Sequence, residues 1–441
     1  MFSNLFTKFK SIRRSFTWLN TFAYSRAVDR QQSALPAHDV RCAQCDLLQK
    51  LDELHAGQQA SCVRCGHHLC SVPLHPFDTP MAYALTALIL LLLSCAFPLL
   101  NLHIAGVESE MTFFSSAKAL VEADFGIVAN VLLSCVLLTP AMFLCAVIYL
   151  AMALKWSIHF PGMRSVLRLA IRLEPWMMAD VFVIGILVSL IKLASLAQIG
   201  LGLSFWAMLL FSIALTKTVA VFDVHWFGFQ LDHLEGLPAQ QLREKGAKSC
   251  PVCGFFNAHN AEKCGRCHAK IYSRQPHSVA MTWALLLTAV SLYVPANVYP
   301  IMITESLGDS VPSTILEGVV LLWNMGSYPV AVIIFVASVA VPLVKFISIA
   351  LLCIAAQSKP GKSALHYTKL YRMTELIGRW SMVDVFVVVI LVALIHMGKL
   401  MSVFPGVAAV SFAGVVVFTM LAALSFDVRL IWDAHPSNEN K

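Results

Sequence analysis

The sequence predicts an all-α polytopic membrane protein, with about eight transmembrane helices in two parallel four-helix repeats and two small cytosolic zinc-ribbon domains. Composition is the first reason: of 441 residues, 58% are hydrophobic and only 13% are charged, a balance unlike that of soluble domains. Duplication is the second. Asp180–Val183 recurs as Asp384–Val387, 204 residues downstream, and Phe222-Asp223 recurs at the same offset. The third reason is that paired cysteines precede each apolar block, as in a metal-binding ribbon.

Long uncharged runs define the expected spans. A helix needs about 20 apolar residues to cross a bilayer, and the runs without Asp, Glu, Lys or Arg are long enough: 79–107, 125–154, 193–216, 276–304, 318–344 and 400–426. The longer stretches 178–222 and 383–426 break around Gln198–Gly202 and Pro405-Gly406. We therefore expect eight helices, at roughly 81–104, 125–154, 178–198, 202–222, 279–303, 328–356, 383–403 and 406–426.

The placement of lysine and arginine predicts the orientation. The loops between spans two and three and between spans six and seven are basic, with Lys155 and Arg164 in the first and Lys369 and Arg372 in the second. The loops after spans one and five are acidic. By the positive-inside rule, both termini and the connector between the halves face the cytoplasm. Four spans per half is an even number, so the halves enter the membrane in the same direction.

This rule also explains most of the net charge of +7, so no nucleic-acid partner is implied. Residues 2–19 alternate apolar and basic side chains near helical spacing, which is typical of an amphipathic helix on the inner leaflet; a disordered tail is the alternative. The expected divisions are a basic N-terminal segment at 1–37, ribbon one at 38–78, repeat one at 79–225, ribbon two with its linker at 226–277, repeat two at 278–428 and a cytosolic tail at 429–441.

Eight of the thirteen cysteines form C-x2-C pairs: Cys42, Cys45, Cys62 and Cys65 before the first block, and Cys250, Cys253, Cys264 and Cys267 before the second. Two such pairs complete a tetrahedral Zn²⁺ site. Disulfides and a redox or Fe–S role are alternatives, but the expected compartment is the reducing cytosol. Because four thiolates fill each site, we expect two structural zinc ions. The neighbouring His67, His68, Cys70 and His268 are expected at the surface.

Lys345 is the most informative polar residue inside the spans. It lies about 11 residues from the cytoplasmic end of span six, or roughly 16 Å along the helix axis. Snorkelling covers only part of that depth, so the ammonium group requires a counter-charge or a hydrated cavity. Asp384, which enters the next span, is the nearest acidic candidate in the sequence. Its repeat partner Asp180 fits either a cavity or a simple cap at the start of a helix.

Further polar groups converge on the same level. Pro342 cannot donate to the carbonyl of Ser338, so span six is expected to kink there. Ser381 shares a helix face with Asp384, the expected partner of Lys345. Thr419 lies at a depth comparable to that of Lys345. The first half has Phe143 where the second has the lysine, so the second half is the better candidate for a working site.

No nucleotide-binding loop and no hydrolase elbow occur in the sequence, so we expect a protein that is not an enzyme. Energy, where needed, would come from an ion gradient, another subunit or the downhill partition of the substrate.

The two ribbons, the Pro295–Asn297 motif and the W-x3-D-V-F-V motif at Trp176 and again at Trp380 resemble the paraquat-inducible protein A family. The closer likeness is to the lipophilic envelope-spanning tunnel protein A branch, from about residue 38 to 432. The resemblance implies a multi-pass inner-membrane protein of diderm bacteria that passes phospholipid to or from a periplasmic MCE-domain tunnel protein. Carried over by position, the implied transport path is lined by Asp180, Ser338, Lys345, Ser381, Asp384 and Thr419.

Two competing functions remain open from the sequence. One is a structural membrane anchor that recruits the tunnel protein without a transport path of its own. The other is a zinc- or redox-responsive membrane sensor.

Overall fold

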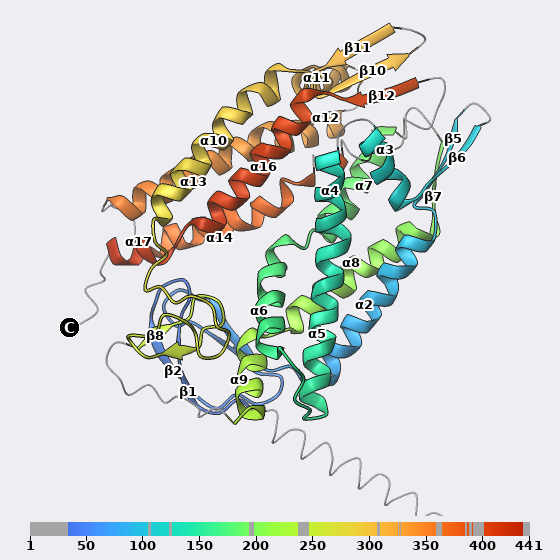
Figure 1. Cartoon of the computed structure of the whole chain (residues 1–441). Coiled ribbons are helices and arrows are strands. Elements are labelled where there is room, and N and C mark those ends of the chain that lie inside the picture. The colour runs from blue at the N-terminus through green and yellow to red at the C-terminus, as the bar shows by residue number, and fades with distance from the viewer. Residues whose placement is uncertain are drawn as a thin grey trace, which may run out of the picture.

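The computed structural model describes residues 34–104, 107–122, 126–193, 198–236, 247–306, 309–324, 326, 328–358, 364–383, 386–387, 390 and 401–434. Two helical bundles lie side by side (Figure 1). The cysteine ribbons gather at one end, and two small β-sheets lie at the other; we call these the ribbon end and the sheet end. Since both copies place their sheets at the same end, the two halves run in the same direction.

The elements of the two halves correspond in order. The first half contains α2 (Asp78–Ala96), α3 (Phe113–Glu122), α4 (Gly126–Leu133), η1 (Ser134–Leu138), α5 (Thr139–Lys155), α6 (Met163–Leu173), η2 (Glu174–Trp176), α7 (Ala179–Leu193), α8 (Leu203–Val221) and α9 (Val224–Leu234). The second contains α10 (Ser278–Val298), α11 (Ile315–Asn324), α12 (Tyr328–Phe335), η3 (Val336–Ala340), α13 (Val341–Gln357), α14 (Ala364–Trp380), α16 (Val407–Ser425) and α17 (Arg429–Ala434).

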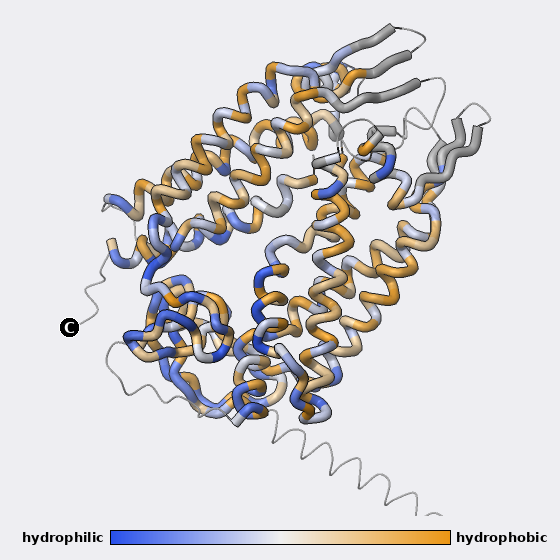
Figure 2. Tube along the Cα trace, in the orientation of Figure 1, coloured by the Kyte–Doolittle hydropathy of each residue, from blue (hydrophilic) through white to orange (hydrophobic). Residues whose placement is uncertain are grey.

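The polytopic helical fold is confirmed. Within the described ranges, seven helices are long and apolar enough to cross a membrane: Asp78–Ala96, Ala129–Lys155, Met163–Leu190, Leu203–Val221, Ser278–Val298, Ala331–Gln357 and Val407–Ser425. Hydrophobic residues dominate these helices, whereas polar residues gather on the ribbons (Figure 2). The eighth expected span, 383–403, lies mostly outside the described residues, as does the expected amphipathic segment at 2–19.

Two of the expected spans extend too far. The first was expected to reach residue 104, but α2 ends at Ala96, and α10 ends at Val298 rather than at 303. Pro98 and Pro300 follow these ends, and each lacks the N–H that would donate the next helical hydrogen bond. The chain instead forms three-stranded sheets: β5 (Leu100–Ile104) pairs with β6 (Val107–Met111) and β7 (Gln198–Leu201), and β10 (Met302–Ser306) pairs with β11 (Asp309–Ser313) and β12 (Met401–Pro405).

Glycine makes the return from each sheet into the membrane possible. Gly202 and Gly406 precede α8 and α16, and their N–H groups donate to the carbonyls of Leu99 and Ile301 at 3.1 and 2.8 Å. A β-carbon on either glycine would collide with the carbonyl of the nearby proline. The two glycines are 204 residues apart, so this close approach of backbones is part of the repeat.

The halves touch where the repeated motifs meet. Phe182 on α7 lies edge-on to Phe386, with ring centroids 5.6 Å apart, and these two residues are repeat partners. A β-carbon on Gly185, one turn further along α7, would lie 3.1 Å from the β-carbon of Phe386. The pseudo-two-fold axis of the molecule therefore passes close to this aromatic pair.

A π-helical turn interrupts the same helix in each half. η1 and η3 are both followed by a proline, Pro140 and Pro342, at the start of α5 and α13. Because proline has no N–H to donate, one helical hydrogen bond is missing, and the wider π turn accommodates this gap. Such turns occur frequently at functional sites, and η3 contains Ser338.

Candidate functional site: two cysteine ribbons and a buried polar cluster

Each cysteine pair lies at the tip of a short hairpin. In ribbon one, β1 (His38–Arg41) pairs with β2 (Leu48–Leu51), and β3 (Gln59–Ser61) pairs with β4 (His68–Ser71). In ribbon two, β8 (Lys248–Ser249) pairs with β9 (Phe256–Asn257). All four tips repeat one hydrogen-bonded turn, in which the residue after the second cysteine donates its N–H to the carbonyl of the first cysteine at 2.8–3.0 Å. That residue has a positive φ in every case: Asp46, Gly66, Gly254 and His268.

The thiols of each ribbon surround one point. Within each set of four, the Sγ atoms all lie within 4.8 Å of one another, and the closest pairs are separated by 3.5 Å in ribbon one and 3.6 Å in ribbon two. A disulfide needs a separation of about 2.05 Å, whereas a tetrahedral Zn²⁺ with bonds of about 2.3 Å puts its sulfurs about 3.8 Å apart. The two four-cysteine groups therefore have the geometry of metal sites and are compatible with zinc.

One neighbour of the first cysteine group is not a surface residue. Cys70 was expected at the surface, but it is fully buried, and its Sγ donates to Oδ1 of Asp223 at 3.7 Å. Burial, together with the negative charge of the Asp223 carboxylate, raises the pKa of Cys70 above its ordinary value. His68 and His268 are exposed, in agreement with their expected position.

Asp223 and Asp427 attach the ribbons to the membrane helices. Asp223 Oδ2 accepts from the backbone N–H of Ser71 at 2.6 Å, and its Oδ1 caps α9. Asp427 Oδ2 accepts from the backbone N–H of Gln275 at 3.0 Å. Both pairs are separated by 152 residues, and both members are offset by 204 between the halves. In the sequence, the shared offset was the signal for this attachment role.

Arg429 completes the attachment in the second half. Its guanidinium group donates to both carboxylate oxygens of Asp427, at 2.8 and 2.7 Å. Burial alone would raise the pKa of Asp427, but the hydrogen bonds and charge of Arg429 leave that pKa below its ordinary value. The carboxylate is therefore ionised under physiological conditions and remains a strong acceptor.

The structure brings Lys345, Ser381 and Thr419 together. The lysine side chain is only 2% exposed, and its ammonium nitrogen donates to Ser381 Oγ at 3.1 Å and to Thr419 Oγ1 at 2.6 Å. Each hydroxyl in turn donates to a carbonyl of its own helix, those of Gly378 and Val416. The hydroxyl hydrogens are thus turned away from the ammonium group, and both oxygen lone pairs face it.

The cluster lies deep in the bundle. Gln357, where α13 ends, is twelve residues beyond Lys345, or about 18 Å along the helix. Ser338, in the π-helical turn seven residues before Lys345 and towards the sheet end, is also buried. Asp180 is exposed at the start of α7 in the first half. The side chain of Asp384 lies outside the described residues, so its expected pairing with the lysine stays a prediction.

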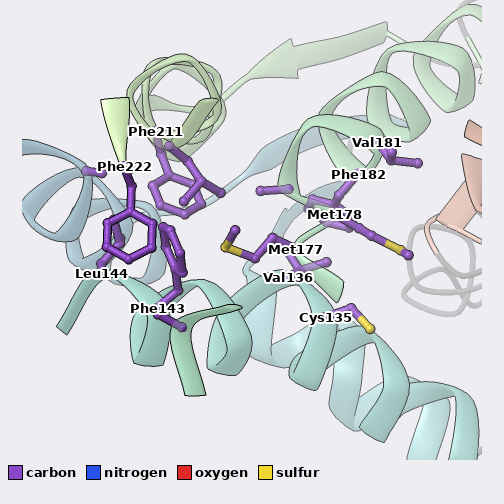
Figure 3. Packing of buried hydrophobic residues seen from close by; sticks show 14 of the residues in the cluster. Cys135, Val136, Phe143, Leu144, Met177, Met178, Val181, Phe182, Phe211 and Phe222 are labelled. Atoms are coloured by element: carbon purple, nitrogen blue, oxygen red, sulfur yellow. The ribbon is translucent and has the colours of Figure 1, made fainter. Parts of the chain in front are cut away.

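The first half is apolar at four of the corresponding positions. Val136, Phe143, Met177 and Leu215 stand where the second half has Ser338, Lys345, Ser381 and Thr419, at offsets of 202 or 204. All four are buried. Figure 3 shows three of them in the packed core, and Phe143 lies edge-on to Phe222 with centroids 5.6 Å apart. Only Phe143 was recognised from the sequence, although the same offsets apply to the other three residues.

The fold and these sites together define a class: a multi-pass membrane protein of two parallel halves, with a pair of four-cysteine ribbons and one half carrying a buried polar cluster. The sequence pattern of the paraquat-inducible protein A family matches residues 77–230 and again residues 279–435. The chain therefore belongs to that family, and each half matches the pattern once.

Relatives of known name cover nearly the whole chain. The intermembrane transport protein PqiA of Escherichia coli strain K12 is 39% identical over 415 residues, which are 92% of this chain and 98% of that protein. The lipophilic envelope-spanning tunnel protein A of the same strain is 32% identical over 409 residues, 91% of this chain and 93% of that protein. A probable intermembrane transport protein of Haemophilus influenzae is 26% identical, covering 90% and 96%. Identity is thus higher to PqiA than to the branch favoured from the sequence. No solved structure matches.

Proposed function

We propose that this protein is a non-enzymatic inner-membrane subunit of a lipid transport system, which passes phospholipid to or from a periplasmic MCE-domain tunnel protein. The names of the relatives support transport between membranes and an envelope-spanning tunnel. In this proposal both termini face the cytoplasm, as the distribution of basic residues favours. The ribbon end is then cytoplasmic, and the sheet end faces the periplasmic partner.

The observation that carries the proposal is the buried ammonium group of Lys345. A charge at membrane depth is costly and is usually retained for function. An ammonium has three N–H donors, so it can hold two hydroxyls and still bind a further acceptor, such as a phosphate oxygen of a lipid headgroup. The proposed path comprises Asp180, Ser338, Lys345, Ser381, Asp384 and Thr419.

Zinc is the proposed occupant of both cysteine groups. Four thiolates and no open coordination position are typical of structural zinc. Zinc bound there would supply the folding free energy that such small ribbons lack.

Photocrosslinking tests the transport path with a matched control inside the same chain. A photoreactive amino acid replaces Thr419 in one variant and its buried repeat partner Leu215 in the other, and lipid is then extracted from each adduct. We expect phospholipid on the Thr419 probe at a yield about tenfold or more above the Leu215 probe, since the Lys345 ammonium beside Thr419 offers a headgroup a polar partner.

Equal yields at the two positions would overturn the transport path. That result, with a tunnel protein still co-purifying, would instead support the structural anchor.

A further inference from the structure

The first ribbon is bonded to both halves of the membrane domain. Its exit residue Ser71 binds the first half through Asp223. Its two metal-binding turns reach across to the second half: Arg372 on α14 donates from Nε to Gln44 Oε1 at 2.6 Å and from Nη2 to the carbonyl of Cys65 at 2.9 Å. Two independent bonds from one guanidinium fix the turn and the helix relative to each other.

A second contact joins the same two parts. The guanidinium of Arg64, between the cysteines of the second turn, lies 4.3 Å from the ring centroid of Trp432 on α17. The indole Nε1 of Trp432 donates to Thr368 Oγ1 on α14 at 3.0 Å. Ribbon one therefore contacts α14 directly and also through α17.

The second ribbon makes the mirror arrangement. Arg266 occupies the same place in its second turn as Arg64 does in the first ribbon, and it binds Asp232 on α9 of the first half at 2.8 and 2.6 Å. Arg164 on α6 donates to the carbonyl of Gly265 at 2.9 Å. Side chains of the first half, Ile171 among them, pack against this ribbon's core. Each ribbon thus crosses to the half that it does not precede in the chain.

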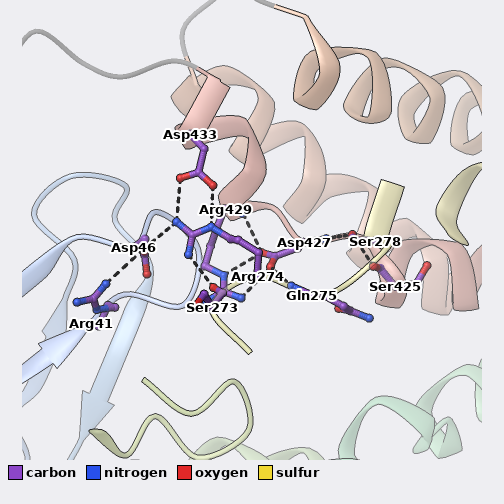
Figure 4. A network of polar contacts seen from close by, with 10 residues as sticks. All are labelled: Arg41, Asp46, Ser273, Arg274, Gln275, Ser278, Ser425, Asp427, Arg429 and Asp433. Atoms are coloured by element: carbon purple, nitrogen blue, oxygen red, sulfur yellow. Dashed lines mark hydrogen bonds and ion pairs between the residues drawn. The ribbon is translucent and has the colours of Figure 1, made fainter. Parts of the chain in front are cut away.

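One arginine, Arg274, links the two ribbons to the second half. Arg274, which follows ribbon two, binds Asp46 of ribbon one at 2.8 Å and Asp433 of α17 at 2.7–2.8 Å (Figure 4). Hydrogen bonds from Arg274 to Asp433, together with those to Asp46, raise the pKa of Arg274 above its ordinary value despite its partial burial. The guanidinium consequently holds both ribbons and the second half at one point.

The helix that ribbon one contacts, α14, ends next to the polar cluster. Arg372 precedes Ser381 by nine residues, or about 13 Å along α14 and its end. Ser381 is one of the two hydroxyls that hold Lys345. We propose that the first cysteine ribbon, in its metal-bound fold, positions this cluster in the opposite half, with Arg372 as the positioning residue. The coupling between ribbon one and the cluster does not depend on the proposed function; only the role of the cluster in lipid transport rests on it.

Hydrogen exchange of the full chain in lipid nanodiscs tests the coupling. We expect Arg372→Ala to speed exchange of the α14 amides by about tenfold or more, because it removes two charge-assisted hydrogen bonds, while α6 stays unchanged. The matched control Arg266→Ala should do the reverse, affecting α9 and α6 but not α14. Gln44→Ala should add little to Arg372→Ala, since both remove the same contact.

A second readout links the coupling to the cluster. Phospholipid on the Thr419 probe should fall severalfold in Arg372→Ala and stay unchanged in Arg266→Ala. Unchanged α14 exchange in Arg372→Ala, or equal effects of both arginine variants on α14, would overturn the positioning role. If the probe captures no lipid even in the unaltered chain, the proposed function fails, while the exchange comparison still decides the coupling.

Discussion

Lys345 and its repeat partner in the first half have very different surroundings. In the first half the same position holds Phe143, which is fully buried and packs edge-on against the ring of Phe222 at no electrostatic cost. In the second half a cation lies between two hydroxyls that each already bond to their own helix. Such a residue is expected to lower stability relative to an apolar isostere, and its retention is best explained by function.

Replacing Lys345 by Met should separate stability from activity. The substitution keeps the volume and removes the buried charge, and both hydroxyls keep their carbonyl partners, so thermal stability should be unchanged or higher. Lipid capture at Thr419 should fall by about tenfold, the loss of one charge-assisted contact. The measurements are a melting curve in detergent and adduct yield. A clear drop in stability with normal capture would show that the lysine is structural.

The reciprocal substitution is the control. Phe143→Lys places an unpaired cation among apolar side chains and should cost about 3–5 kcal/mol, without creating a lipid adduct in the first half.

At the scale of elements, the ribbons show how little sequence a metal-binding turn needs. Each turn has two cysteines, a residue with positive φ after them and two backbone hydrogen bonds. Glycine fills that position twice, whereas Asp46 and His268 adopt the strained conformation without it. Because each ribbon has few buried apolar residues beyond its cysteines, the bound ion would supply much of the stability of its fold.

Metal analysis of purified protein tests the metal content of each ribbon separately. The intact chain should contain about two zinc ions, and Cys250→Ser about one, since a tetrahedral site does not survive the loss of a thiolate. Cys145→Ser, an exposed cysteine outside both groups, is the matched control and should keep both ions. Iron in place of zinc, or an unaltered metal content in Cys250→Ser, would contradict the assignment.

Across the whole molecule, two kinds of contact hold the halves together. Near the centre, the apolar core is continuous through Phe182 and Phe386. At the ribbon end, arginines cross between each ribbon and the opposite half. The polar bonds at the ribbon end would therefore resist a relative movement of the two halves. The axis of such a movement would lie at the contact between Phe182 and Phe386.

A double-mutant cycle measures that central contact. We expect Phe182→Ala and Phe386→Ala each to lower the free energy of unfolding by about 3–5 kcal/mol. Their coupling should be about 0.5–1.5 kcal/mol, the value for paired aromatic rings. Reversible unfolding in detergent micelles gives both quantities. Strictly additive effects would mean that the rings do not stabilise each other.

Much of this architecture could be predicted because its signals are local. Uncharged length indicates spans, and cysteine spacing indicates metal-binding turns. The sheets were missed because Leu100–Ile104 is uncharged and prolongs the run without Asp, Glu, Lys or Arg, so Pro98 is the main mark of the change from helix to strand. The crossing of the ribbons could not be predicted, since it depends on contacts such as Arg372 with Cys65, which are 307 residues apart. Of the polar cluster, depth identified Lys345 and placed Thr419 at a comparable level, whereas the hydrogen bond between the two residues needed the fold.

The aromatic contact at the pseudo-axis also bears on how such a chain arose. In a homodimer of one four-helix unit, the residue on the two-fold axis meets its own copy, and each metal domain is free to dock on the neighbouring subunit. Phe182 and Phe386 keep that self-meeting inside one polypeptide. Fusion of two copies of one gene would preserve that dimer interface while letting the two halves diverge, in agreement with a phenylalanine at position 143 and a lysine at position 345.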